Sequence, residues 1–234
     1  MIPFTAPLLV SACNDAAPVG AAGARALILD LAGADEDMKA AARGWAAQLL
    51  ARRDGVVRIV RVNGLLSGHV EADLEMLAPL APDAVLLPDC QGGDDAQHVS
   101  VKLGVREAEA GLVVGSVGLI ACVGASAALF RLGSYCGATQ RLQALTWSAP
   151  ALALDVGAQG YLEDGMLSGP MSLARNLTLF AAAAACVCAL DGPYKELDDL
   201  DGLQRICMAA KRDGFAGKIA LSLAQMRVIE AAFE

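Results

Sequence analysis

Charged and amide side chains end three short apolar runs of this 234-residue chain. Asp30 ends ALILD, Arg61 and Asn63 end VRIVRVN, and Asp191 ends CALD. A guanidinium binds carboxylates and phosphates with good geometry, and carboxylates can bind a metal ion or move a proton. We therefore expect these run ends to supply the chemistry of the protein.

Arg61 is the most informative of these residues because it alternates with valines. If Val60 and Val62 face a layer of helices, Arg61 and Asn63 face the opposite side of the sheet. A buried guanidinium needs an anionic partner, which is either a ligand or an internal carboxylate. Spacing alone leaves both open, since Asp30 and Asp191 could each be structural or functional.

The elements that position these residues alternate along the chain. Eight strand-like runs lie at 6–13, 26–32, 56–63, 84–90, 114–122, 142–148, 186–192 and 218–223. Helical patterns lie at 35–53, 69–80, 125–134, 171–185, 200–211 and 224–233. This alternation predicts a parallel sheet, and eight βα units predict a single (β/α)8 TIM barrel over residues 1–234, with a doubly wound open sheet as the alternative. Barrel enzymes carry their chemistry at the carboxyl ends of the strands, where the residues above lie.

Composition narrows the class of protein. The net charge of −8 and the lack of a basic cluster argue against a nucleic-acid partner. The longest apolar run, 179–190, is too short to cross a bilayer, so no membrane partner is expected. Seven scattered cysteines favour a reduced, cytoplasmic setting over a disulfide framework.

The cysteines offer little chemistry by themselves. Cys186 and Cys188 share one face of a strand, but a metal site needs more ligands, which favours core packing. Cys122 ends a strand and could be a nucleophile, yet no histidine nearby in the sequence would activate it.

The ordered segments resemble the citrate lyase beta-subunit family, which includes malyl-CoA lyases and related aldolases. The resemblance runs from about residue 24 to the end of the chain and rests on ARALILDLAGADEDMKAAAR, VRVN, AVLLPDC, SLARNL, ALDGPYKELDDLDGL and GFAGKIALSLAQ. It implies a (β/α) barrel that cleaves or forms carbon–carbon bonds in hydroxyacyl thioesters or hydroxy acids, usually with Mg²⁺. It also implies a homo-oligomer, a trimer or a hexamer.

The resemblance assigns roles to individual residues. Arg61 matches the family's substrate-binding arginine, and the other matching positions are Asp30, Lys39, Arg43, Asn63, Arg175, Asp191, Gly192, Pro193, Gly217, Lys218 and Gln225. We therefore predict Arg61 and Asp30 as catalytic residues. We predict substrate contacts from Arg61, Asn63, Asp191, Gly192 and Pro193.

The departures from the family gather where metal chemistry is expected. A metal-binding glutamate at the end of the fifth strand aligns with Ala121, and an aspartate ligand aligns with Ala151, with Asp155 as the nearby substitute. A family lysine is replaced by Asp89. Two interpretations follow: a lyase with a rearranged, degenerate metal site, or a catalytically inactive barrel that binds an acyl thioester or a partner.

Overall fold

The computed structural model describes residues 4–12, 23–52, 54–163 and 165–234, and its centre is an eight-stranded parallel sheet. The strands follow one another in the order β1-β2-β3-β4-β5-β6-β9-β10. Their bounds are Leu8–Ser11, Ala26–Asp30, Val57–Arg61, Ala84–Leu87, Gly118–Val123, Leu142–Trp147, Cys188–Asp191 and Gly217–Lys218. Each of the eight runs predicted as strands overlaps one of these strands, and their parallel order is confirmed.

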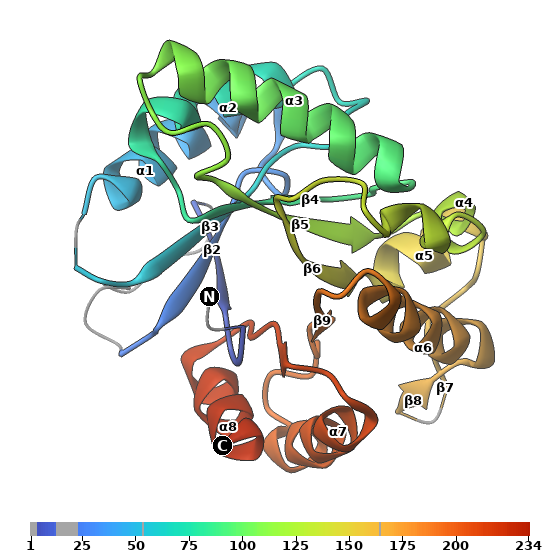
Figure 1. Ribbon diagram of the computed structural model, residues 1–234. Coiled ribbons are helices and arrows are strands. Elements are labelled where there is room, and N and C mark those ends of the chain that lie inside the picture. Colours follow the sequence, from blue (N-terminus) through green and yellow to red (C-terminus); the bar gives the residue numbers. More distant parts are fainter. Residues whose placement is uncertain (1–3, 13–22, 53, 164) are drawn as a thin grey trace.

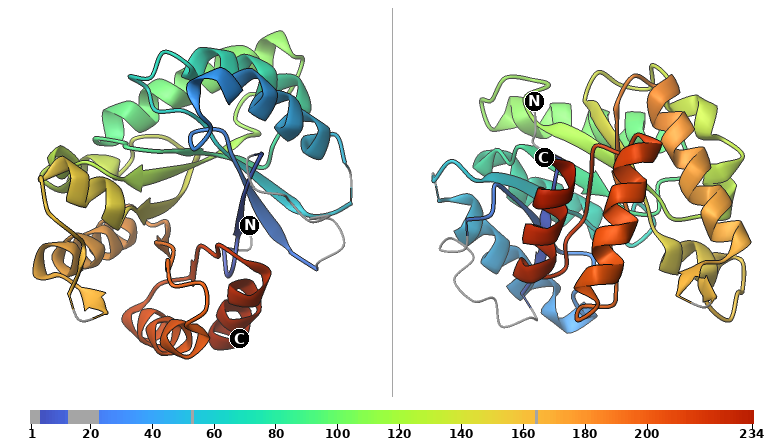
Figure 2. Two further views of the ribbon diagram at one scale, coloured as in Figure 1. Left: turned by 180° about the vertical axis from the view of Figure 1, so that it is seen from behind. Right: turned by 90° about the horizontal axis from the view of Figure 1, so that it is seen from below.

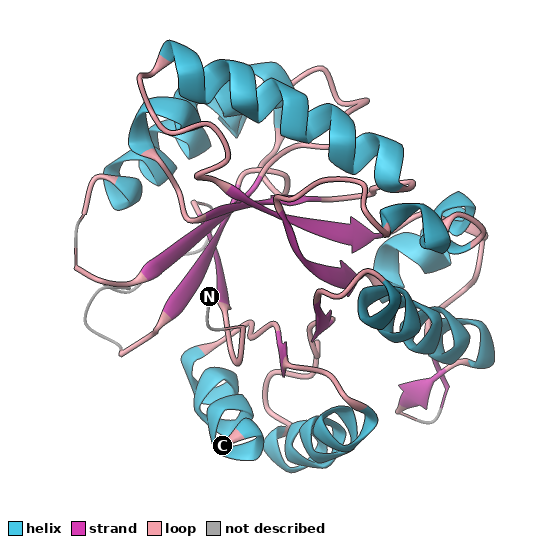
Figure 3. Cartoon of the chain, in the orientation of Figure 1, coloured by secondary structure: helices cyan, strands magenta, loops and turns pink. Residues whose placement is uncertain are grey.

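The sheet curls, and the helices cover its outer side (Figures 1 and 3). The α-helices are α1 Lys39–Leu50, α2 Val70–Leu77, α3 Gly93–Glu109, α4 Ser126–Leu129, α5 Ala149–Asp155, α6 Gly169–Ala184, α7 Leu200–Asp213 and α8 Leu223–Phe233. Short 3-10 turns at Glu36–Met38, Ala78–Leu80 and Leu132–Tyr135 adjoin or extend them. A small hairpin, β7 Leu162–Glu163 and β8 Met166–Leu167, lies between α5 and α6.

Backbone hydrogen bonds join the segments that carry the first and last strands of the sheet. The Leu9 amide donates to the Ala220 carbonyl at 2.9 Å, and the Ala220 amide donates to the Pro7 carbonyl at 3.0 Å. The Lys218 amide also donates to the Thr5 carbonyl at 3.0 Å. In the view of Figure 2 the segments at the two ends of the chain accordingly lie side by side.

Side chains alternate between two apolar clusters on the two sides of the sheet. The inner cluster contains Ile28, Ile59 and Ile120, whereas the outer cluster, shared with the helices, contains Val60 and Val62. The alternation predicted for the third strand is therefore confirmed, and Arg61 lies on the inner side. The aliphatic character of both clusters follows from the shortage of aromatic residues in the chain.

Two helices and the hairpin are not predicted from the sequence. The longest helix, α3, buries Ala96, Val99 and Leu103, but the next position of that stripe is Glu107, and Val101 is exposed. The apolar periodicity that reveals an amphipathic helix is thus interrupted. Within the described residues, no helix is long and apolar enough to cross a membrane.

Candidate functional site

A cavity of about 560 Å³ opens at the carboxyl ends of β2, β3 and β4. We call it the mouth cavity, and it is lined by residues from 32–39, 61–69 and 88–95. Its size is in the range of small-molecule sites. Its position is the one at which parallel βα folds carry their active sites.

Arg61 enters the mouth cavity from the end of β3 and pairs with Asp30 at the end of β2. Its Nη1 lies 3.1 Å from Oδ1 and 3.0 Å from Oδ2 of Asp30. The Asp30 side chain is 8% exposed, while that of Arg61 is 33% exposed. The internal salt bridge anticipated from the sequence is therefore formed with Asp30 through Nη1, and the Arg61 side chain still lines the cavity.

Asn63 is held by two charged residues that sequence analysis does not connect with it. Lys39 Nζ donates to Asn63 Oδ1 at 2.6 Å and also to the carbonyls of Leu31 and Ala32 at 3.3 and 3.2 Å. Asn63 Nδ2 and its backbone amide donate to the fully buried Asp73 at 2.7 and 2.8 Å.

Asp73 is a residue that the sequence analysis misses. It lies on the buried side of α2 with Val70 and Leu77, and it also accepts from Arg43 Nε at 2.7 Å. A carboxylate on an otherwise apolar stripe is the signal that could have identified it, because such a group requires partners. It joins α1, α2 and the end of β3 into one network.

Asp89 projects from the turn after β4 and is exposed in the mouth cavity. Its backbone is left-handed, with φ +50°. A Cβ placed on Gly124 would overlap Asp89 Oδ1 and would lie 3.4 Å from the Cβ of Ala151. The carboxylate therefore lies over Gly124, whose missing side chain leaves room for it.

The fifth strand presents Cys122, and not Ala121, to the inner side. Ala121 belongs to the outer cluster with the helices, whereas Cys122 belongs to the inner cluster. The expectation that the side chain at 121 faces the mouth is therefore corrected by the alternation of the strand. Burial raises the pKa of Cys122 to about 12, although the charge of Arg61 opposes this, so the group is a thiol at neutral pH.

Asp191, Gly192 and Pro193 do not join Arg61. They line a separate side cavity of about 400 Å³, whose other lining residues come from 147–150, 161–162, 165–167, 172–176, 194–195, 206–213 and Lys218. Because Ala189 lies in the outer cluster and Leu190 in the inner one, Asp191 points outward, toward α6 and α7. The predicted set of substrate contacts is thus divided between two cavities.

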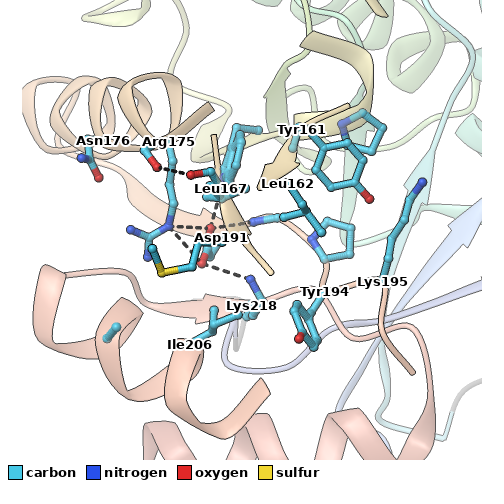
Figure 4. Close-up of a pocket in the computed structure, with 18 of the residues that line it drawn as sticks. Tyr161, Leu162, Leu167, Arg175, Asn176, Asp191, Tyr194, Lys195, Ile206 and Lys218 are labelled. Carbon is cyan, nitrogen blue, oxygen red and sulfur yellow. Dashed lines mark hydrogen bonds and ion pairs between the residues drawn. The ribbon is translucent and has the colours of Figure 1, made fainter. Parts of the chain in front are cut away.

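In the side cavity Asp191 is enclosed by cations (Figure 4). Its carboxylate accepts from Arg175 Nε at 3.2 Å, Lys218 Nζ at 3.1 Å and Trp147 Nε1 at 2.8 Å. Burial opposes ionisation, but the charges of Lys218 and Arg175 and these hydrogen bonds hold the pKa of Asp191 below its ordinary value. This geometry is that of a buried structural ion cluster.

The described residues do not provide a cage of ligands for a metal ion. Among them, no group of three or more His, Cys, Asp or Glu side chains is placed to hold one. Asp155 ends α5 and accepts from the Ser126 amide at 2.6 Å, and it is not among the residues that line the mouth cavity. Mg²⁺ is held by oxygen ligands, and neither Ala121, which faces the outer cluster, nor Ala151 supplies one.

The sequence profile of the HpcH/HpaI aldolase/citrate lyase family matches residues 11–222. The chain belongs to this family. A (3S)-malyl-CoA thioesterase from Cereibacter sphaeroides is 29% identical to it over 75% of this chain and 56% of the relative. The citrate lyase subunit beta of Leuconostoc mesenteroides subsp. cremoris is 24% identical over 75% and 57%. The chain thus spans about half the length of the curated relatives it matches.

A solved family structure agrees with the fold. The protein CitE from Mycobacterium tuberculosis, in complex with magnesium and acetate, superimposes with a TM-score of 0.83 at 25% identity. The match covers 98% of this chain and 90% of that one. The family resemblance inferred from the sequence is confirmed. The structural match to CitE extends over nearly the whole chain.

Proposed function

We propose that the mouth cavity binds a hydroxyacyl thioester of the CoA type, or the corresponding hydroxy acid, through its carboxylate at Arg61. The observation that carries this proposal is the partly exposed side chain of Arg61, oriented by the buried Asp30 at the carboxyl ends of adjacent parallel strands. Relatives named for malyl-CoA and citrate support the choice of ligand.

Arg61 and Asp30 have different roles in this proposal. The carboxylate of Asp30 accepts hydrogen bonds from Arg61 and, at 3.0 Å, from the Gly33 amide. Asp30 is therefore a positioning residue. Arg61 contacts the substrate. In a lyase reaction a base takes the proton of the substrate hydroxyl, which becomes a carbonyl as the carbon–carbon bond breaks. The bonding electrons form the enolate of the acyl thioester, and this enolate then takes up a proton to give the released thioester. A cation fixed by the protein keeps the carboxylate of the substrate in place during this step.

The lack of a carboxylate cage in the described residues favours a second candidate function. In that alternative the protein is a catalytically inactive barrel that binds an acyl thioester or a partner through the same cavity. Both candidates require Arg61, and they differ in turnover alone. We route no step through Mg²⁺, because the residues at the mouth do not fit its coordination.

Substitution of Arg61 tests ligand binding directly. Arg61→Ala should weaken binding of malyl-CoA about 10- to 100-fold, since hydrogen bonds to charged groups contribute about 1.5–3 kcal/mol. Arg61→Lys should recover part of the loss, because a lysine keeps the charge but not the fork of donors. Binding is measured by calorimetry with and without Mg²⁺.

The control is Arg227→Ala, which removes an exposed arginine from α8 and should leave the affinity unchanged. Malyl-, citramalyl- and citryl-CoA are then incubated with the wild-type protein, and released thioester products are measured. Cleavage that Arg61→Ala abolishes supports the lyase, and binding without cleavage supports the inactive barrel. Equal binding by wild type and Arg61→Ala contradicts the proposal.

We further propose that the curled sheet is a closed (β/α)8 barrel, supported by the hydrogen bonds between the β1 and β10 segments. A homo-oligomer, trimer or hexamer, stays a prediction, which sedimentation analysis can test.

A further inference from the structure

We infer that Asp89 determines specificity: it admits one substrate carboxylate, bound at Arg61, and rejects a second. The favoured ligand therefore carries a single free carboxylate and a hydroxyl group that donates to Asp89. This inference rests on the proposed function of the mouth cavity and names the class of substrate that the cavity accepts.

Most charged groups of the mouth cavity are already occupied by internal partners. The ammonium group of Lys39 donates hydrogen bonds to Asn63 and to two backbone carbonyls. Glu36 pairs with His69 at 2.8 Å, and Asp95 accepts from the Gln91 amide at 2.8 Å. Lys39 can reach a ligand only at the loss of an existing contact, and each of the two carboxylates already holds one donor group.

Two charged groups at the mouth remain available. In the described part of the chain, Nε and Nη2 of Arg61 have no hydrogen-bond acceptor, and no side chain donates to the carboxylate of Asp89. The cavity therefore offers a ligand one site for an anion and one acceptor for a hydrogen-bond donor. A hydroxy monocarboxylate unit satisfies both.

The position of Asp89 is fixed by the backbone. A left-handed φ is uncommon outside glycine, although aspartate and asparagine tolerate it, and here it turns the side chain over Gly124. Gly124 leaves space that any larger side chain at that position would fill. The carboxylate is therefore held at the mouth by local geometry and without a salt bridge from any described residue.

The charge balance of the cavity opposes ligands with several carboxylates. Its lining carries Arg61 and Lys39 against Glu36, Asp89 and Asp95, and the buried Asp30 paired with Arg61 adds a fourth carboxylate, so carboxylates outnumber arginine and lysine by two. A second ligand carboxylate near Asp89 meets a like charge with no cation available to offset it. Like charges at close range in a partly desolvated site repel strongly enough to change affinity roughly tenfold.

The experiment compares three small acids as probes of the full chain, by ligand-observed NMR titration in buffer with EDTA. Lactate has one carboxylate and a hydroxyl, propionate lacks the hydroxyl, and malate adds a second carboxylate. Wild type should bind lactate more tightly than either. Asp89→Asn should raise the affinity for malate roughly tenfold and reduce the advantage of lactate over propionate, because a neutral amide keeps the shape and tolerates the left-handed backbone.

The matched control is Asp94→Asn, which removes the same charge from an exposed carboxylate that pairs with Arg131 outside the cavity. It should leave the order of the three acids unchanged. Equal affinity of wild type for lactate and malate, or the same shift in both variants, overturns the inference while binding at Arg61 stands. If no acid binds, or if Arg61→Ala has no effect on the acids that do, the proposed function fails as well.

Discussion

At the scale of single residues, the salt bridge of Arg61 is compatible with the proposed ligand binding and does not compete with it. The pair with Asp30 engages one end of the guanidinium and leaves the side chain 33% exposed. A cation that is already oriented loses less conformational freedom when a ligand binds. The two interpretations of Arg61 considered from the sequence are therefore compatible with each other.

Gly124→Ala should disturb the mouth cavity through Asp89. The added methyl group would overlap Asp89 Oδ1 and approach its Cα at 3.3 Å, so the carboxylate must move. We expect a loss of about 1–3 kcal/mol in the free energy of unfolding, as for overpacked sites. We also expect an increased affinity for malate relative to lactate, measured by chemical denaturation and NMR titration.

Gly133→Ala is the matched control for that experiment. A Cβ at Gly133 meets nothing within 4 Å, so stability and ligand preference should both be unaffected. A Gly124→Ala protein with wild-type stability and wild-type ligand preference would show that Asp89 is not fixed as described.

The sequence predicts the direction of Arg61 but not that of Asp191, for a physical reason. Arg61 lies between valines in a strand whose polar and apolar residues alternate, which fixes its side. Asp191 ends CALD, in a strand buried on both sides, where Ala189 and Leu190 are equally apolar. Strands buried on both faces read as continuous apolar runs and do not specify which side the last residue takes.

At the scale of elements, α3 is anchored by a buried ion pair at the end of the sheet opposite the mouth. Glu107 is buried and accepts from Arg141 Nη1 and Nη2 at 2.8 and 2.5 Å, and from the amides of Gly115 and Val117 at 2.7 and 2.8 Å. The helix is thereby joined to the strand starts of β5 and β6. The charged side chain of Glu107 stands where the stripe of α3 would have an apolar residue. The helical periodicity of this segment is therefore not recognised in the sequence.

Glu107→Gln should destabilise the protein by about 3–5 kcal/mol, because it leaves the guanidinium of Arg141 buried and unpaired. The control is Glu109→Gln, two residues further along the same helix, which breaks an exposed pair with Arg106 and should cost less than about 1 kcal/mol. Urea denaturation of both variants measures the difference, and equal effects would contradict the role assigned to Glu107.

The same residue predicts a dependence of stability on pH. Burial tends to raise the pKa of Glu107, but its hydrogen bonds and the charge of Arg141 outweigh this and lower it to about 2, from an ordinary 4.5. A lowered pKa in the folded state stabilises the protein fully above the ordinary value, and this stabilisation is lost as the pH falls from about 4.5 toward 2. The Glu107→Gln variant should lack this part of the acid dependence.

At the scale of the whole molecule, the sheet depends on contacts between segments from opposite ends of the chain. Gly217, in β10, lies against the backbone of residues 4 and 5, and a Cβ there would overlap the carbonyl oxygens of Phe4 and Thr5. Sequence patterns predict eight strands in order, because that information is local. They do not predict which strand ends meet, since this pairing depends on the curvature of the assembled sheet.

Gly217→Ala should therefore separate the first and last strands while the rest of the sheet stays paired. We expect a loss of several kcal/mol in the free energy of unfolding, because backbone atoms must move to accept the methyl group. Hydrogen exchange should accelerate at the amides of Leu9, Lys218 and Ala220, which make the joining hydrogen bonds, and much less at Leu119 in the central β5.

The matched control is Gly44→Ala, on α1, where an added Cβ meets nothing within 4 Å. This variant should be neutral or stabilising by up to about 1 kcal/mol. Unchanged exchange at Leu9 and Ala220 in Gly217→Ala would show that these strands are not joined in solution, and would argue for an open curled sheet.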